Sequence, residues 1–371
     1  MKKSLQTIQY QIHLQAQRRE SHFEQLHEYF QKTTLIEAAA KHIGISRKKA
    51  ISVTKQVLKQ QYRPQEVRYV DIPKDHGKTR TISIIHEADK FLQFALKCLM
   101  EPIFEADFLP CSFGFRPMLS PKHAIAKVLE LVKQGHTALL QLDIAQYFDG
   151  INHEQLMTTI QQRIRDPIVL QLISLWVKQC GNLGVPQGSP LSPLLANIYL
   201  HPFDQVVTQA GGKKGFHYLR FADDLLFLAP SSSKLPLKLA KSELKQINLK
   251  LQSAKTAKFD LRKQALNYLG FELNLIKQSR YWGIKRQWFP QLLPNTKAFN
   301  KWEASLAKQA KAGKHKNWEP LKKALHRWLQ PYKCDQLDWQ VLNQIIVHQI
   351  SEYYKLSPDL VAQQIPLQSW K

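Results

Sequence analysis

The chain has 371 residues, 44% of them hydrophobic, which is enough to bury a large core in two or three domains. Lysine and arginine total 53 against 29 acids, a formal net charge of +24, so we expect a polyanionic partner, nucleic acid before an anionic membrane. The four cysteines lack CxxC spacing, which argues against a disulfide framework or a zinc module. No apolar run approaches the roughly 18 residues of a membrane span, so we expect a cytoplasmic protein without a membrane partner. The alternative is a ribosome-associated or simply soluble basic protein.

The N-terminal part predicts helices followed by one hairpin. Leu5, Ile8 and Ile12 recur at helical spacing, and residues 35–59 indicate two helices joined near Gly44. This pair resembles a DNA-reading helix-turn-helix, but two helices packed inside a larger domain is the interpretation that we favour. The segments EVRYVDIP and TRTISII alternate as strands around a turn at residues 75–78.

The rest of the chain mixes strands and helices without strict alternation, which predicts the α+β class. Strand patterns occur in ALLQLDI, FHYLRFA, DLLFLAP and ALNYLGFEL. Helical patterns occur at residues 89–104, 121–133, 153–164, 167–179, 191–207 and 233–251, and again in a basic tail from about residue 295 onward. Four tryptophans are interleaved with the lysines of this tail and are expected to pack its helices together: Trp302, Trp318, Trp328 and Trp339.

The segment RFADDLLFL places Asp223 and Asp224 side by side between two apolar strands. Ionised carboxylates so close together repel one another unless cations pair with them. If strand 138–144 lies beside this hairpin, Asp143 joins them at one edge of a sheet. Hard oxygen ligands with open positions suit Mg²⁺, and two such ions about 3.5–4 Å apart are the arrangement for nucleotidyl transfer. A capping or ion-pairing role is the alternative for any single one of these acids.

RFADDLLFL resembles the aromatic-x-Asp-Asp hairpin of reverse transcriptases, and further blocks follow in the order of that family. YVDIPKDHGKTRTISI resembles the fingers hairpin, and LKLQSAKTAKF and YLGFEL match the blocks that close the palm. SFGFRP, LDIAQYFDGINH and GVPQGSPLSPLLANIYL are similar to the group II intron branch. The resemblance covers about residues 60–275 and implies a right-hand polymerase. Its expected parts are N-terminal helices and fingers with part of the palm at 1–137, the catalytic palm at 138–276 and a helical basic thumb at 277–371.

The resemblance implies the following metal and acid roles. Asp143 and Asp223 would be the principal ligands of two Mg²⁺ ions, for which Mn²⁺ is the substitute. The Ile144 carbonyl would be an extra ligand, and Asp224 a weaker one. Lys255 would be the acid for the pyrophosphate leaving group.

The same resemblance implies binding roles. Phe148 would be the sugar gate that excludes a 2′-hydroxyl, with core packing as the alternative. Gln187 and Gly188 would line the incoming nucleotide, where glycine permits close backbone approach. Three basic residues of the fingers would grip the triphosphate: Arg68, Lys74 and Arg80. The residues expected at the primer and template are Arg116, Tyr268, Gly270, Lys308, Lys311, Lys322 and Lys323.

Three positions depart from the family pattern without removing a catalytic group: Phe221 replaces a common tyrosine, Lys90 an arginine and Ala254 an acid. The leading interpretation is an RNA-directed DNA polymerase that uses dNTPs and an RNA template to make a DNA product. A template-independent or self-primed DNA polymerase and a CRISPR-linked enzyme are alternatives. A non-catalytic splicing cofactor that binds RNA is disfavoured, because such a protein would be free to lose the three acids. We expect a stand-alone enzyme without an endonuclease, acting in antiphage defence with a structured non-coding RNA, and leave protein partners or an oligomer open.

Overall fold

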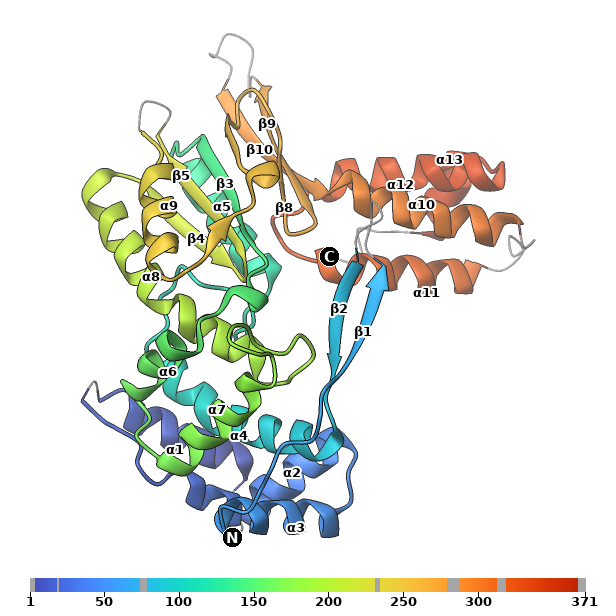
Figure 1. Ribbon diagram of the computed structural model, residues 1–371. Coiled ribbons are helices and arrows are strands. Elements are labelled where there is room, and N and C mark those ends of the chain that lie inside the picture. The colour runs from blue at the N-terminus through green and yellow to red at the C-terminus, as the bar shows by residue number, and fades with distance from the viewer. Residues whose placement is uncertain are drawn as a thin grey trace. The chain divides into compact units, whose positions relative to one another are not determined.

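The computed structural model describes residues 4–18, 20–73, 79–230, 234–278, 287–311 and 318–365, apart from the side chains of Arg80, Gln278 and Lys311. The chain forms two compact units. The first comprises Met1–Leu119, Gln141–Phe227 and Pro236–Thr256, and the second comprises Ser120–Leu140, Leu228–Leu235 and Ala257–Lys371. Figure 1 labels most of their helices and strands.

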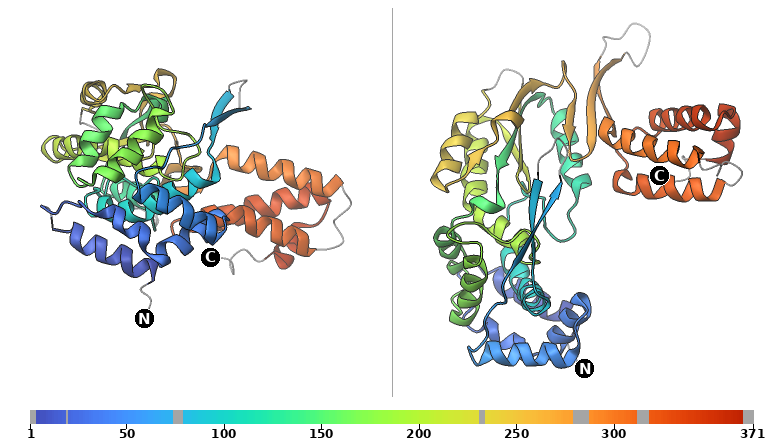
Figure 2. Two further views of the ribbon diagram at one scale, coloured as in Figure 1. Left: turned by 60° about the horizontal axis from the view of Figure 1, so that its bottom comes forward. Right: turned by 45° about the vertical axis from the view of Figure 1, so that its right-hand side comes forward.

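Four helices build the N-terminal part of the first unit. They are α1 (Leu5–Ala16), α2 (Thr33–Ile43), α3 (Arg47–Leu58) and α4 (Glu87–Glu105), with a short 3₁₀ helix, η1 (Leu26–Gln31), between the first two. Helix α4 is the apolar centre of this group, and α1, α2 and α3 all pack against it (Figure 2, blue and cyan). Gly44, with φ of +85°, ends α2, and the Ser46 hydroxyl caps α3. The predicted helix pair is therefore confirmed, packed within a larger unit.

Strands β1 (Arg68–Pro73) and β2 (Thr79–Ile84) form the predicted hairpin. They are antiparallel, with Arg68 opposite Ile84 and Pro73 opposite Thr79. The turn predicted at residues 75–78 lies outside the described residues. The hairpin is solvated along β1, all of whose residues are exposed.

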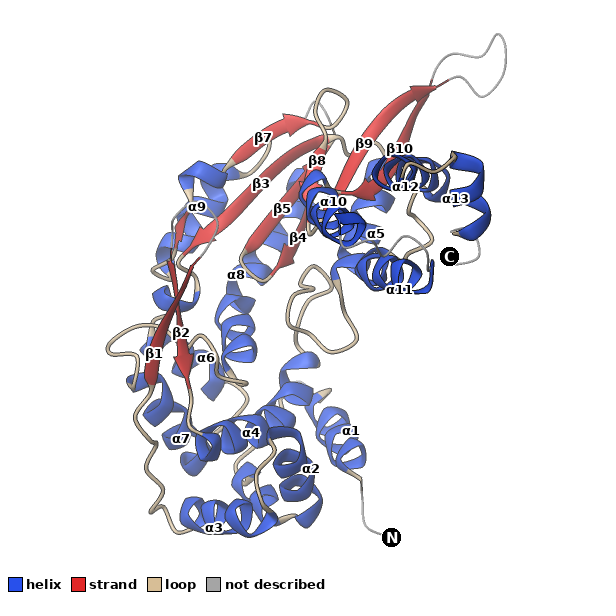
Figure 3. Ribbon diagram, turned by 90° about the vertical axis from the view of Figure 1, so that its right-hand side faces the viewer, coloured by secondary structure: helices blue, strands red, loops and turns tan. Residues whose placement is uncertain are grey.

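A five-stranded sheet contains three of the predicted strand segments, ALLQLDI, FHYLRFA and DLLFLAP. Its strands are β3 (Ala138–Ala145), β4 (His217–Phe221), β5 (Asp224–Ala229), β6 (Lys250–Leu251) and β7 (Ala257–Asp260). The order is β4-β5-β3-β6, with β7 also paired to β3. Figure 3 labels β4, β5, β3 and β7 of this sheet. Leu225 to Ala229 are all buried, so β5 is covered on both faces. This explains why its sequence is an uninterrupted apolar run.

Among the described residues of the first unit, four further α-helices lie between the strands in the sequence, three between β3 and β4 and one between β5 and β6. They are α6 (His153–Gln161), α7 (Pro167–Lys178), α8 (Ser192–Lys214) and α9 (Leu237–Gln246). Helix α8 packs against β4, α6 and α9, so it connects the sheet to its helical cover. Residues 233–251 were predicted as helical throughout, but they end in the two-residue strand β6, which is too short to show a pattern of its own.

The second unit contains α5 (Pro121–Lys133) and the antiparallel sheet β10-β9-β8, with strands β8 (Leu266–Tyr268), β9 (Phe271–Gln278) and β10 (Gln287–Pro294). The prediction of one strand in ALNYLGFEL is wrong. Leu269 and Gly270 have φ of +52° and +88°, so they form a two-residue turn that folds this segment into a hairpin. Strand β10 was not predicted, because its two prolines lower strand propensity.

Helices α10 (Thr296–Lys311), α11 (Trp318–Leu329), α12 (Trp339–Tyr354) and α13 (Pro358–Gln364) complete the second unit. The rings of Trp302 and Trp328 stack with their centroids 5.1 Å apart. The Trp328 indole also donates a hydrogen bond to the Ala298 carbonyl at 3.1 Å. The predicted aromatic packing is therefore confirmed for Trp302 and Trp328, which join α10 to α11. Among the described residues, none of the helices combines the length and apolarity that crossing a bilayer requires.

Candidate active site

The turn between β4 and β5 positions two of the predicted acids. Ala222 and Asp223 connect the strands, and Asp224 is the first residue of β5. Ala222 has φ of +56°, an uncommon conformation for a residue with a side chain, so surrounding contacts must hold the turn. The Ile144 N–H of β3 donates a hydrogen bond to the Asp223 carbonyl at 3.1 Å. This bond ties the turn to the residue that follows Asp143.

The structure brings Asp143, Asp223 and Asp224 into one electrostatic cluster. Burial, and then the charges of Asp223 and Asp143, raise the pKa of Asp224 to about 6, while Lys255 opposes this shift. The Lys255 ammonium donates a hydrogen bond to Asp143 Oδ2 at 2.5 Å, and this bond raises the pKa of Lys255. The Gln252 N–H donates to the Asp143 carbonyl at 2.7 Å, which fixes the segment leading to Lys255. Three carboxylates thus face one lysine.

This donor set fits a divalent cation that is shared with a substrate. Within the described ranges, no three His, Cys, Asp or Glu side chains lie close enough to make a complete metal cage. Mg²⁺ rarely uses such a cage, since it takes one or two carboxylates and fills its shell with water and substrate phosphates. A cation would also relieve the crowding of negative charge that raises the pKa of Asp224.

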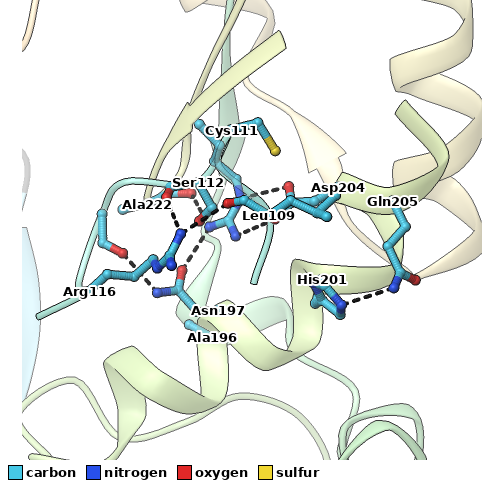
Figure 4. Close-up of polar contacts among 12 residues, drawn as sticks. Leu109, Cys111, Ser112, Arg116, Ala196, Asn197, His201, Asp204, Gln205 and Ala222 are labelled. Carbon is cyan, nitrogen blue, oxygen red and sulfur yellow. Dashed lines mark hydrogen bonds and ion pairs between the residues drawn. The ribbon is translucent and has the colours of Figure 1, made fainter. Parts of the chain in front are cut away.

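A buried ion pair beneath the hairpin holds the turn. Arg220, the penultimate residue of β4, and Asp204 of α8 are both fully buried. Arg220 Nη2 donates to Asp204 Oδ2 at 2.6 Å, and Nε donates to Oδ1 at 2.9 Å, a two-bond fork (Figure 4). Burial alone would lower the pKa of Arg220, but the charge of Asp204 and its hydrogen bonds raise it. The Tyr218 hydroxyl donates a further bond to Asp204 at 2.9 Å.

The same guanidinium connects the turn to a neighbouring loop. Arg220 Nη1 donates to the Ala222 carbonyl at 3.3 Å and to Asn197 Oδ1 at 2.8 Å. Asn197 Nδ2 in turn donates to the Gly114 carbonyl at 2.8 Å (Figure 4). A Cβ at Gly114 would lie 2.3 Å from the Ala222 nitrogen, so only glycine permits this approach. The loop, α8 and the turn that bears the acids therefore form one hydrogen-bonded network.

Asp204 and Asn197 were missed by the sequence reasoning. Both are buried polar residues of α8, and they lie seven residues apart. Two turns of helix separate them, so they lie on the same face. The signal in the sequence is a pair of polar residues at a spacing that places both on the apolar face of the predicted helix, where polar side chains need hydrogen-bond partners.

Arg116 was expected at the template, and its contacts are all internal. Its Nε donates to both oxygens of Glu105 at 3.1 Å, and Nη1 donates to the carbonyls of Leu109 and Ser112 at 3.0 and 2.8 Å. These bonds hold the loop around Gly114. They favour a role in positioning that loop over direct contact with a template.

Phe148 lies in the short 3₁₀ turn Phe148–Gly150 that follows β3. Its ring is half-buried and meets the Phe115 ring edge-on, with centroids 6.0 Å apart. Its neighbour Tyr147 is fully buried and donates a hydrogen bond to the Ala196 carbonyl. Tyr147 therefore anchors the turn in the core, while the Phe148 ring stays partly accessible, as contact with a substrate requires.

The loop at Gln187 and Gly188 docks on the fingers hairpin. The Ser83 N–H of β2 donates to the Gln187 carbonyl at 2.7 Å. Gly188 has φ of +137°, and a Cβ there would lie 2.3 Å from the Ser83 carbonyl oxygen, so the backbones meet only because the residue is glycine. Gln187 Nε2 donates to Asp149 Oδ1 at 3.0 Å, which links the loop to the turn that bears Phe148.

The other expected binding residues lie in different surroundings. Arg68 is exposed at the start of β1, while Lys74 and the side chain of Arg80 lie outside the described residues. In the second unit, Tyr268 is buried at the end of β8 and Gly270 forms the adjoining turn. Of the tail lysines, Lys308 and Lys323 are exposed, Lys322 pairs with Glu319 at 3.6 Å, and the Lys311 side chain lies outside the described part.

Comparisons with known proteins agree on the family. A model of the family "Reverse transcriptase (RNA-dependent DNA polymerase)" matches residues 72–273. Protein YkfC of Escherichia coli is 39% identical over 163 residues, 40% of this chain and 43% of that protein. The group II intron-encoded protein LtrA of Lactococcus lactis is 36% identical over 177 residues, 45% of this chain and 29% of that protein. The chain thus spans less than half the length of these curated relatives.

A solved structure of telomerase from Candida albicans aligns with a TM-score of 0.47 at 12% identity, over 83% of this chain and 63% of that one. The matched family segment contains more than half of the chain, including β3, the β4–β5 hairpin and all three acids. By this match the protein belongs to the reverse transcriptase family.

Proposed function

We propose that the protein is an RNA-directed DNA polymerase that copies an RNA template into DNA from dNTPs. The observation that carries this proposal is the cluster of Asp143, Asp223 and Asp224, in which burial and the charges of the other two acids raise the pKa of Asp224 to about 6. Lys255 is the cation that pairs with Asp143. Holding three acids close together is electrostatically unfavourable, and a chain that only bound RNA would not need such an arrangement. The buried network beneath the turn supports the same conclusion, because it holds the acids in place.

In this proposal Asp143 and Asp223 would hold two metal ions, with help from the Ile144 carbonyl and more weakly from Asp224. Mg²⁺, or Mn²⁺ in its place, would supply positive charge that favours deprotonation of the attacking hydroxyl and stabilises the leaving oxygen. Lys255 would donate a proton to the leaving pyrophosphate or stabilise its negative charge. The hydrogen bond to Asp143 raises the pKa of Lys255 and so keeps the side chain charged beside the site.

Around these acids, Gln187, Gly188 and Phe148 would form the pocket of the incoming nucleotide, and Arg68, Lys74 and Arg80 would bind its phosphates. The exposed Lys308 and Lys323, together with Lys322 and Lys311, would contact the backbone of the product duplex. The turn at Gly270 would support the primer end through its backbone, since the Tyr268 side chain is buried.

Replacing Phe148 with alanine should admit ribonucleotides, because the half-buried ring is what meets a 2′-hydroxyl. We expect the preference for dNTP over rNTP, measured as the ratio of kcat/KM values, to fall by about tenfold or more. Phe115→Ala is the matched control, since it removes the neighbouring ring and leaves the gate. If the ratio stays at the wild-type value in a folded Phe148→Ala variant, the ring serves packing alone.

Primer extension tests the function directly. The purified protein should elongate a DNA primer annealed to RNA when Mg²⁺ and all four dNTPs are present, and the product should be complementary to the RNA. Omitting the template should stop synthesis. Synthesis without a template would instead favour the template-independent polymerase, and no synthesis under any of these conditions would favour a non-catalytic splicing cofactor.

The cellular role that we propose is antiphage defence, with a structured non-coding RNA as the template. The resemblance to domesticated bacterial reverse transcriptases is its support, and a CRISPR-linked role is the alternative. The identity of the RNA that copurifies with the protein distinguishes the two.

A further inference from the structure

A groove with no role in the site described above lies between α9 and β6. It encloses about 830 Å³ and is entirely within the first unit. Leu244 and Leu249 are buried along it. The complete lining is Lys241, Leu244, Lys245, Asn248, Leu249, Lys250, Leu251, Ser253 and Thr256.

All the charged side chains that line this groove are positive. Lys241 and Lys245 are four residues apart on α9, so they lie on the same side of the helix, and Lys238 continues the row three residues earlier. Lys250 faces the groove from β6. All four lysines are exposed, and none has an ion-pair partner among the residues that the structure describes. The acid of α9, Glu243, does not line the groove and accepts a hydrogen bond from Gln246.

The shape and chemistry favour a nucleic-acid strand over a single small anion. Seven residues separate Lys238 from Lys245, a row of about 10 Å along the helix. A row of ammonium groups along an open groove suits a chain of phosphates, each of which can meet a different lysine. The lining contains no aromatic residue on which a base could stack, so the contacts would be to the backbone and independent of sequence.

We propose that the groove between α9 and β6 binds a single strand of RNA through its phosphates. This inference rests on the proposed function and adds a second RNA contact to it. The groove adjoins β3, the strand that contains Asp143. Strand β6 pairs with β3, with Lys250 opposite Ala145 and Leu251 opposite Ile144. RNA held here stays attached to the enzyme beside Asp143 while another part of the same molecule is copied.

The test compares two pairs of lysines that differ in their surroundings. Lys241→Gln with Lys245→Gln removes two charges from the groove. Lys213→Gln with Lys214→Gln removes two exposed charges from the last turn of α8, outside the groove. Affinity for a labelled single-stranded RNA oligonucleotide is measured across a salt series for both variants and the wild type. Each lost phosphate contact lowers the log–log salt slope by about 0.7, so the groove variant should lose about 1.4 and the control nothing.

A groove variant that melts at the wild-type temperature and keeps the wild-type slope would overturn the proposal. So would an unchanged slope combined with a raised KM for dNTP, which would assign the groove to a free triphosphate. Primer extension by the wild-type protein is measured alongside. The absence of primer extension would refute the proposed function. The difference in salt slope between the two variants separately decides whether the groove binds RNA.

Discussion

Replacing Asp223 and Asp224 with asparagine should abolish dNTP incorporation on a primed RNA and leave RNA affinity nearly unchanged. In the proposed function, incorporation depends on metal ions that these carboxylates would hold, whereas RNA affinity depends mainly on lysine and arginine. A metal ion supplies several kcal/mol to the transition state, and each 1.4 kcal/mol is about tenfold in rate, so we expect a loss of about 10³-fold or more. Single-turnover incorporation and RNA binding are the two measurements.

Misfolding can be separated from this loss. The raised pKa of Asp224 means that its charged form is disfavoured by burial and by the neighbouring acids, so a neutral amide there should not lower the melting temperature. Asp359→Asn is a suitable control, because this exposed acid lies in the first turn of α13 and does not belong to the cluster. Incorporation by the double variant at the wild-type rate would remove the metal assignment.

The acids of the site were predictable because their signals are local. Asp223 and Asp224 are adjacent, and an apolar run on either side makes their placement costly unless something positive is near. Asp143 also follows an apolar strand, and the hydrogen bond from Ile144 to Asp223 realises the predicted neighbourhood of the two segments. Helices with a strong apolar periodicity, such as α4 and α5, were predictable for the same reason.

What could not be predicted depends on contacts between distant residues. The pairing of Lys255 with Asp143 joins positions 112 apart, and the fork between Arg220 and Asp204 requires α8 to lie under β4. The prediction of short elements fails for a different reason. Two residues of β6 and three of β8 are too few to establish a period, so they form only because a neighbouring strand offers hydrogen bonds.

The second prediction with a large effect concerns the buried network. Asp204→Asn leaves the Arg220 guanidinium buried without its counter-charge, and Arg220→Met leaves the Asp204 carboxylate in the same state. Each should cost about 3–5 kcal/mol of unfolding free energy. Removing both with Asp204→Leu and Arg220→Met leaves no uncompensated charge, so the double variant should cost clearly less than the sum of the single ones.

Catalysis should not recover with stability. Arg220 also donates to the Ala222 carbonyl and to Asn197, and an apolar pair restores neither bond, so the turn that bears Asp223 loses its support. In a double variant that is folded at the assay temperature, kcat should remain depressed while KM for dNTP changes little, because the acids are mispositioned and the nucleotide pocket is intact. Asp107→Asn is the matched control, since it breaks the largely buried pair with Arg163, which does not contact the turn. That variant should lose stability and keep its kcat. If kcat returned together with stability in the double variant, the network would support the fold alone, and the position of the acids would depend on the backbone bond between Ile144 and Asp223.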